Sequence, residues 1–120
     1  MSAVNAFENS LLLLLFNNTA IANIGDATGL PATATAGSSQ LALATVALSD
    51  TTADLTVTEV AYTGYARPTQ ARSSAGWTVS GNNASNAAAI VFGEMAAGGP
   101  DTVVHFGLGL MATGDVIRIH

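Results

Sequence analysis

Hydrophobic residues follow a helical spacing only at the start of the chain. They recur three or four positions apart, which places them along one side of a helix. These positions are Val4, Phe7, Leu11, Leu14 and Leu15. We predict a helix over residues 3–18, with Ser2 as its N-cap. Asn17 and Asn18 are expected to end it, because asparagine tolerates the left-handed conformation found at helix C-termini.

Apolar side chains extend round most of the circumference of this predicted helix. Leu12, Leu13 and Phe16 widen the apolar side formed by the regularly spaced positions. A helix that is apolar on nearly all sides is normally buried on nearly all sides, and one sheet in so small a chain covers only one side. We therefore predict that residues 11–16 pack on a sheet on one side and on another subunit on the other. Leu12, Leu13 and Phe16 are the interface candidates.

Beyond the helix, the pattern changes to short runs typical of β-strands. Residues 19–40 carry turn residues and small side chains without a regular period, and we expect an extended connector there. Apolar and polar residues then alternate in short runs between turn residues. The expected strands cover residues 40–48, 55–62, 65–71, 77–80, 87–92, 103–111 and 115–119, the last two forming a hairpin. Pro68 cannot donate a backbone hydrogen bond, so we predict an edge strand or a bulged strand at its position.

These elements predict a mainly β protein. The expected fold is a small antiparallel β-sandwich or barrel of six to seven short strands with one N-terminal α-helix. A chain of 120 residues has the length of one domain, so we assign residues 1–120 to a single domain with a β-region over 41–119.

Charge excludes several classes of partner. The net charge is −5, and the three cationic side chains are Arg67, Arg72 and Arg118. Nucleic-acid binders neutralise phosphates with clustered cations, so we expect no contact with nucleic acid and none with an anionic membrane surface. Only 9% of residues are charged, which favours a surface covered by copies or partners. Arg67 and Arg72 flank Pro68 and are candidates for contacts with acidic partner groups; the alternative is that both are solvated.

Candidate chemistry is sparse. The chain has two histidines, His105 and His120, and no cysteine. The histidines do not occur in a spacing typical of metal sites or of catalytic triads. Gly107-Leu108-Gly109 lacks the third glycine and the helix of a dinucleotide loop. We therefore predict no catalytic, cofactor or metal site and no enzymatic activity. The leucine run follows Glu8 with no basic residue before it and is too short to span a bilayer, so we expect no export signal and no membrane anchor.

Several segments taken together carry a resemblance. They are Asn5–Glu8, Phe16–Asp26, Tyr62-Thr63-Gly64-Tyr65-Ala66-Arg67, Gly76-Trp77-Thr78-Val79, Asn86–Ile90 and His105-Phe106-Gly107. With these segments the chain resembles a family of small tailed-bacteriophage virion proteins, over about residues 5–111. Members are labelled as tail-fibre proteins or as capsid cement (decoration) proteins. One departure lies at Ala44–Leu48, where members often carry a Leu-His-Thr-Ala-Asp-Pro-like segment.

The resemblance implies a structural role in the virion. A cement protein binds the outer capsid surface and bridges neighbouring major-capsid subunits, often as a trimer. Two alternatives stay open: a tail or tail-fibre component, and a small carbohydrate-binding β-module. In the second, Trp77, Tyr62 and Tyr65 would form the stacking platform, whereas Trp77 could instead anchor the core.

Overall fold

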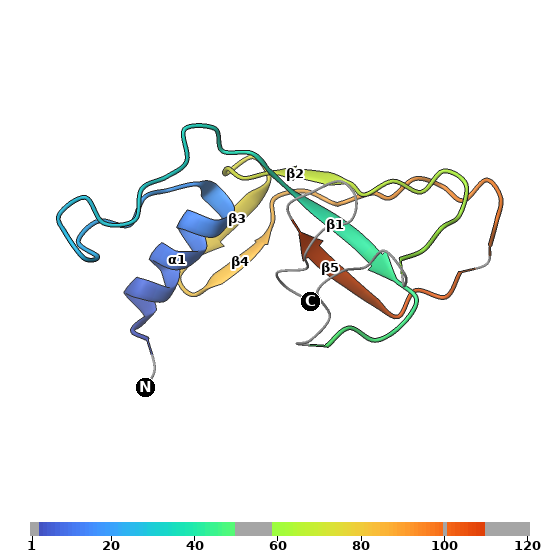
Figure 1. Ribbon diagram of the computed structural model, residues 1–120, viewed down its shortest axis with the longest axis horizontal. Helices are drawn as coiled ribbons and strands as arrows, with labels where there is room; N and C mark the ends of the chain where they lie inside the picture. Colours follow the sequence, from blue (N-terminus) through green and yellow to red (C-terminus); the bar gives the residue numbers. More distant parts are fainter. Residues whose placement is uncertain (1–2, 50–58, 100, 110–120) are drawn as a thin grey trace. The chain divides into compact units, whose positions relative to one another are not determined.

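One helix and five strands make up the regular structure of residues 3–49, 59–99 and 101–109, the part of the chain that the computed structural model describes (Figure 1). The elements are α1 (Asn5–Asn17), β1 (Ser38–Ala44), β2 (Thr69–Ala71), β3 (Trp77–Ser80), β4 (Asn83–Asn86) and β5 (His105–Gly109). The fold is mainly β with one N-terminal helix and two small antiparallel sheets, which confirms the predicted class. Among the described residues the sheets do not close into the barrel that was one predicted form.

The chain groups into two compact units. Unit 1 is drawn from residues 1–38 and 71–89, and unit 2 from residues 39–70 and 90–120. The assignment of residues 1–120 to a single domain stays a prediction.

In unit 1, α1 packs on the hairpin of β3 and β4 (Figure 1). Val4 is the N-cap, in place of the predicted Ser2; its backbone is extended and it makes no side-chain capping bond. The C-terminal prediction is confirmed, because Asn18 adopts the left-handed conformation with φ 53° and ψ 37°. The backbone N–H of the next residue, Thr19, donates to Leu13 O at 3.1 Å, so one carbonyl of the last turn is satisfied.

The β3–β4 hairpin corrects one strand prediction. β3 has the predicted bounds, but the strand expected over 87–92 is wrong: β4 forms instead at Asn83–Asn86, where we predicted a polar turn. Gly81, the first of the two turn residues, has φ 61°, as a type II′ turn requires. This turn fixes the register in which Trp77 lies opposite Asn86. Pairing with β3 therefore makes Asn83–Asn86 a strand, although these residues have weak strand propensity.

In unit 2, β1 is the central strand of a sheet ordered β2-β1-β5 (Figure 1). β1 and β5 are antiparallel, with Leu41 opposite Leu108. β2 lies at the edge of this sheet, which confirms the edge-strand prediction. Only the end of the segment expected over 65–71 forms this strand. Just before it, Pro68 O accepts a hydrogen bond of 3.1 Å from Leu41 N. Of the strand predicted over 55–62, residues 55–58 lie outside the described residues, and the described part forms no strand, only a bridge between Glu59 and Ala44. The end of the strand predicted over 103–111 and the strand predicted over 115–119 also lie outside the described residues.

Each unit has a small core of its own. In unit 2, Ala42, Ala44 and Leu48 form a buried apolar cluster. In unit 1, Phe16, Ile21 and Trp77 are buried. The connector expected to be extended is a folded loop over residues 21–30, where the backbones of Ile21 and Leu30 exchange hydrogen bonds of 2.9 and 2.8 Å. The connector therefore contributes a core side chain to unit 1.

Candidate interface and the residues that support it

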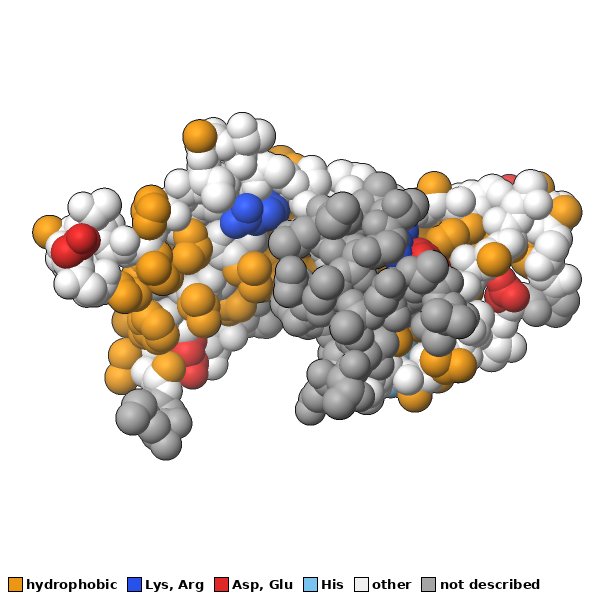
Figure 2. Space-filling view, in the orientation of Figure 1, with side chains coloured by type: hydrophobic (Ala, Val, Ile, Leu, Met, Phe, Trp, Pro, Cys, Tyr) orange, Lys and Arg blue, Asp and Glu red, His pale blue; other side chains and the backbone are white. Residues whose placement is uncertain are grey.

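Helix α1 presents a row of large apolar side chains to solvent. Val4, Phe7, Leu11 and Leu15 are 70%, 41%, 47% and 38% exposed, and we call these four residues the α1 stripe. Their spacing of three, four and four residues keeps them on one side of the helix. Figure 2 shows hydrophobic side chains gathered over this region of unit 1. The described residues of unit 1 leave the stripe as an exposed apolar surface.

The interface candidates chosen from the sequence lie elsewhere on the helix. Phe16 is a core residue: it is 6% exposed, and its ring centroid lies 4.6 Å from that of Trp77. Leu12 and Leu13 are half-buried. At 100° per residue, Phe16 projects about 140° away from Leu11. The helix circumference is apolar nearly throughout, so the sequence held no polar side from which to decide which leucines face outward.

Arg72 stabilises the C-terminal end of α1. Its Nε donates to Leu15 O at 2.7 Å and its Nη2 to Leu14 O at 2.8 Å. Its Nη1 donates to Ala36 O at 2.9 Å, which ties the connector to the same group. A cation at this end also interacts favourably with the helix dipole, and α1 has no basic residue in its own last turn. The guanidinium is engaged within unit 1, and we do not retain Arg72 as an interface candidate.

The side chain of Asn18 makes hydrogen bonds that hold the connector next to this end of α1. Thr33 N donates to Asn18 Oδ1 at 2.9 Å, and Asn18 Nδ2 donates to Thr33 O at 2.8 Å. Thr33 Oγ1 donates a further bond of 2.8 Å to Asn18 Oδ1. Together with Arg72, these bonds fix the C-terminal turn of α1 and hold Leu15 of the stripe in place.

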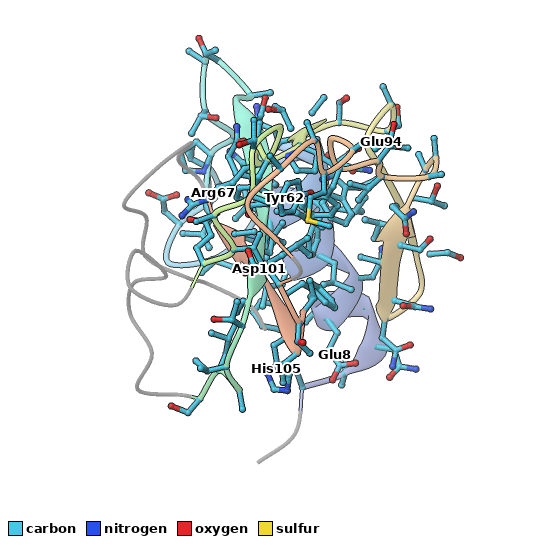
Figure 3. The ribbon with its side chains drawn as sticks, turned by 90° about the vertical axis from the view of Figure 1, so that its right-hand side faces the viewer. Glu8, Tyr62, Arg67, Glu94, Asp101 and His105 are labelled. Carbon is cyan, nitrogen blue, oxygen red and sulfur yellow. The ribbon has the colours of Figure 1, made fainter. Side chains whose placement is uncertain are left out.

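Arg67, which is labelled in Figure 3, belongs to unit 2, where it is paired with Glu59. Nε and Nη2 of Arg67 donate to the two carboxylate oxygens at 2.8 Å each, and the side chains are only 5% and 17% exposed. Tyr65 OH donates to Glu59 Oε1 at 2.5 Å and accepts from Leu43 N at 3.0 Å. Arg67 is therefore a structural residue of this unit, and we do not retain it as an interface candidate either.

Burial and the neighbouring carboxylate act together on Tyr65. Loss of solvent raises the pKa of its hydroxyl, and the hydrogen bond to Glu59 raises that pKa further, well above its usual range. Phe92 stacks on the Tyr65 ring with centroids 6.2 Å apart, and Tyr62 meets it edge-on at 5.3 Å. The side chains of Tyr62, Tyr65 and Arg67 therefore contact other residues of unit 2, whereas Thr63, Gly64 and Ala66 are exposed.

Trp77 is a core anchor and does not form an exposed platform. It is 8% exposed in unit 1, whereas Tyr62 and Tyr65 belong to unit 2. Its indole N–H is buried and finds no hydrogen-bond partner in the part of the chain that the structure describes. A carbohydrate platform needs ring faces open to solvent, and Trp77 does not offer one.

The remaining titratable residues form no metal-binding cluster in the ranges 3–49, 59–99 and 101–109. His105, at the start of β5, accepts a hydrogen bond of 3.0 Å at Nδ1 from Leu48 N (Figure 3). It therefore has a structural partner in unit 2. Of the helices in the described part, none is long and apolar enough to cross a membrane.

Comparison with protein-family models, with curated proteins and with solved structures found no match to this chain.

Proposed function

We propose that this chain is a structural protein of a tailed-bacteriophage virion, a capsid cement protein that binds the outside of the head and stabilises contacts between major capsid subunits. The α1 stripe carries the proposal. It exposes four large apolar side chains in a chain with only 9% charged residues. Contiguous apolar surface of this kind marks a contact with another protein. The resemblance of segments such as Tyr62–Arg67 to small phage virion proteins supplies the setting.

The proposal includes partners and location. The partners are the major capsid protein and further copies of this chain, as a trimer at three-fold or quasi-three-fold positions of the shell. The protein lies on the outer capsid surface of virions assembled in the host cytoplasm. A sandwich arrangement of the strands, the absence of enzymatic activity and cofactors, and the absence of nucleic-acid contacts belong to the same proposal.

A cement protein of this type acts by adding contact area across the shell. One interface of standard size buries about 1,600 Å², and the lattice multiplies that contribution many times. The charges favour contacts that depend weakly on salt, because screening acts mainly on exposed charges. Arg67 is paired with Glu59, and Arg72 is bonded to backbone carbonyls, so neither arginine is offered to the capsid.

Heat-triggered DNA release tests the proposal. Particles that lack the protein should release DNA at a lower temperature than complete particles, and adding the purified chain back should restore the difference. The restored difference should be similar at low and high salt. Equal release temperatures with and without the chain would contradict the proposal and favour the tail or tail-fibre alternative.

A further inference from the structure

We propose that His105 makes the position of the segment over residues 45–48 depend on pH. The neutral ring holds Leu48 beside the start of β5, and the protonated ring releases it. The structural evidence lies in unit 2 alone. The inference goes beyond the cement role and does not require it.

The hydrogen bond between Leu48 and His105 joins a backbone donor to a titratable acceptor. Leu48 N donates to Nδ1 of the ring at 3.0 Å. Nδ1 accepts only while it carries a lone pair, so the geometry assigns the proton of the neutral ring to Nε2. When the ring gains a second proton, both of its nitrogens become donors. Nδ1–H would then face the Leu48 N–H, and this bond cannot form.

The bond holds the chain against the sheet just after β1 ends. The last residue of β1 is Ala44, whose O accepts a hydrogen bond of 2.9 Å from Val104 N. Leu48 follows four positions later and is buried in the apolar cluster with Ala42 and Ala44. A backbone N–H of a buried residue that loses its acceptor destabilises the arrangement that buries it. Loss of the acceptor on His105 should therefore free the Leu48 backbone from β5 and loosen its packing in the cluster.

The ring is accessible to protons from solvent, because His105 is an exposed residue at the start of β5. Histidine is the side chain whose charge changes between about pH 8 and pH 5. The bonded arrangement requires the neutral ring. Its stabilisation is therefore present at the upper end of this range and is lost as pH falls.

Glu59 is the charged residue in line with His105 across the sheet. Both lie opposite Ala44 of β1, so their side chains point to the same face, and two strand spacings place their backbones about 10 Å apart. The Glu59 carboxylate is paired with Arg67 and accepts a hydrogen bond from Tyr65 OH. This carboxylate is therefore engaged on its own side of Ala44.

The other carboxylates in the described part of unit 2 are those of Glu94 and Asp101. Asp101 accepts a hydrogen bond of 3.0 Å from Ala61 N. Figure 3 shows His105 apart from both of them and from Arg67. β1 itself carries no charged residue. Among the residues that the structure describes, the hydrogen bond to Leu48 is thus the polar contact that protonation of the ring changes.

NMR of the isotopically labelled chain at about pH 8 and about pH 5 tests the inference. At the higher pH we expect the ring signals of a neutral His105 protonated at Nε2, and a coupling through the hydrogen bond between Leu48 N and Nδ1. At the lower pH the ring should be protonated and the coupling absent. Protection of the Leu48 amide from hydrogen exchange, corrected for the intrinsic effect of pH, should fall about tenfold.

Substitutions separate the charge of the ring from its role as an acceptor. In His105→Asn the side-chain oxygen can accept from Leu48 N but takes up no proton in this range, so protection should be the same at both pH values. His105→Leu removes the acceptor, and protection should be low at both. The matched control is His120→Asn, which replaces the other histidine of the chain and should keep the native response. Circular dichroism should show that each variant retains its strands.

Three results would overturn the inference. The first is equal protection of Leu48 at both pH values in the native chain, whether the ring gains its proton or stays neutral. The second is a His105→Asn variant that responds to pH as the native chain does, and the third is a His105→Leu variant that keeps Leu48 protected. None of them bears on the cement role, which the temperature of DNA release tests separately.

Discussion

Arg67 donates two parallel hydrogen bonds of 2.8 Å to Glu59, and both side chains lie largely inside unit 2. A bidentate pair of this kind is among the stronger polar contacts in proteins. Glu59 forms a β-bridge with Ala44 of β1. Arg67 directly precedes Pro68, which is followed by β2. The pair therefore joins the two ends of the segment over residues 59–67.

Replacing Arg67 should destabilise the fold more than any exposed charge would. In Arg67→Met the buried carboxylate of Glu59 loses the two hydrogen bonds that the guanidinium donates, and we expect a loss of about 3 kcal/mol in the free energy of unfolding at neutral pH. Urea denaturation measures this loss. The paired variant Arg67→Met/Glu59→Leu should recover part of it, because the buried carboxylate is then removed as well. A single variant as stable as the native chain would show that the pair does not support unit 2.

The raised pKa of Tyr65 predicts a loss of stability at alkaline pH. Its hydroxyl keeps its proton in the folded state beyond the usual value of 10.0 and releases it more readily when the chain unfolds. The stabilisation is therefore complete below about pH 10 and falls as pH rises towards the folded pKa. Tyr65→Phe should lose this alkaline slope. In a Tyr62→Phe background, which leaves Tyr65 as the sole tyrosine, phenolate absorbance should appear only with unfolding or well above pH 10. Ionisation of the folded chain near pH 10 would contradict this account.

Arg72 should matter chiefly for α1. Arg72→Met removes three hydrogen bonds to carbonyls at the helix end and in the connector, and we expect a loss of about 2 kcal/mol. Trp77 is the only tryptophan and lies in the same unit, so its fluorescence reports the unfolding of unit 1. Arg72→Lys should restore only part of the stability, because a single ammonium cannot reproduce the planar fork of the guanidinium. Full rescue by lysine would show that Arg72 stabilises unit 1 only through its positive charge.

Gly29 tests the folded connector. Its φ is +66°, and an added Cβ would lie 2.0 Å from Ile21 O, so Gly29→Ala should break the loop closure. Gly25→Ala is the matched control, since Gly25 has φ +80° but no atom within 4 Å of the added Cβ. The control should lose only about 1 kcal/mol from its backbone conformation, and Gly29→Ala clearly more. Thermal unfolding compares the two, and equal losses would argue against a folded loop over residues 21–30.

The sequence was informative where local pattern decides structure. The helix ends at Asn17–Asn18 as the left-handed preference of asparagine predicts, and β3 follows the short run beginning at Trp77. It was uninformative where a distant partner decides. The partners of Arg72 are Leu14, Leu15 and Ala36, more than 30 positions away, and no local pattern identifies them.

The strand β4 is a second feature that the local sequence did not predict. The residues Asn83–Asn86 have weak strand propensity and read as a turn, yet the two-residue turn at Gly81 pairs them with β3. The sequence also did not show which side of α1 is exposed within unit 1. Phe16 packs on Trp77, which leaves Leu11 and Leu15 outside, and a helix that is apolar nearly all round gives no polar side to orient it.

Location of the chain in the virion tests the cement proposal most directly. Electron-microscopy reconstructions of phage particles with and without this protein should differ on the outer surface of the head. The account predicts additional density over the contacts between neighbouring major capsid subunits, repeated across the lattice. Difference density confined to the tail or its fibres, with none on the head, would contradict it.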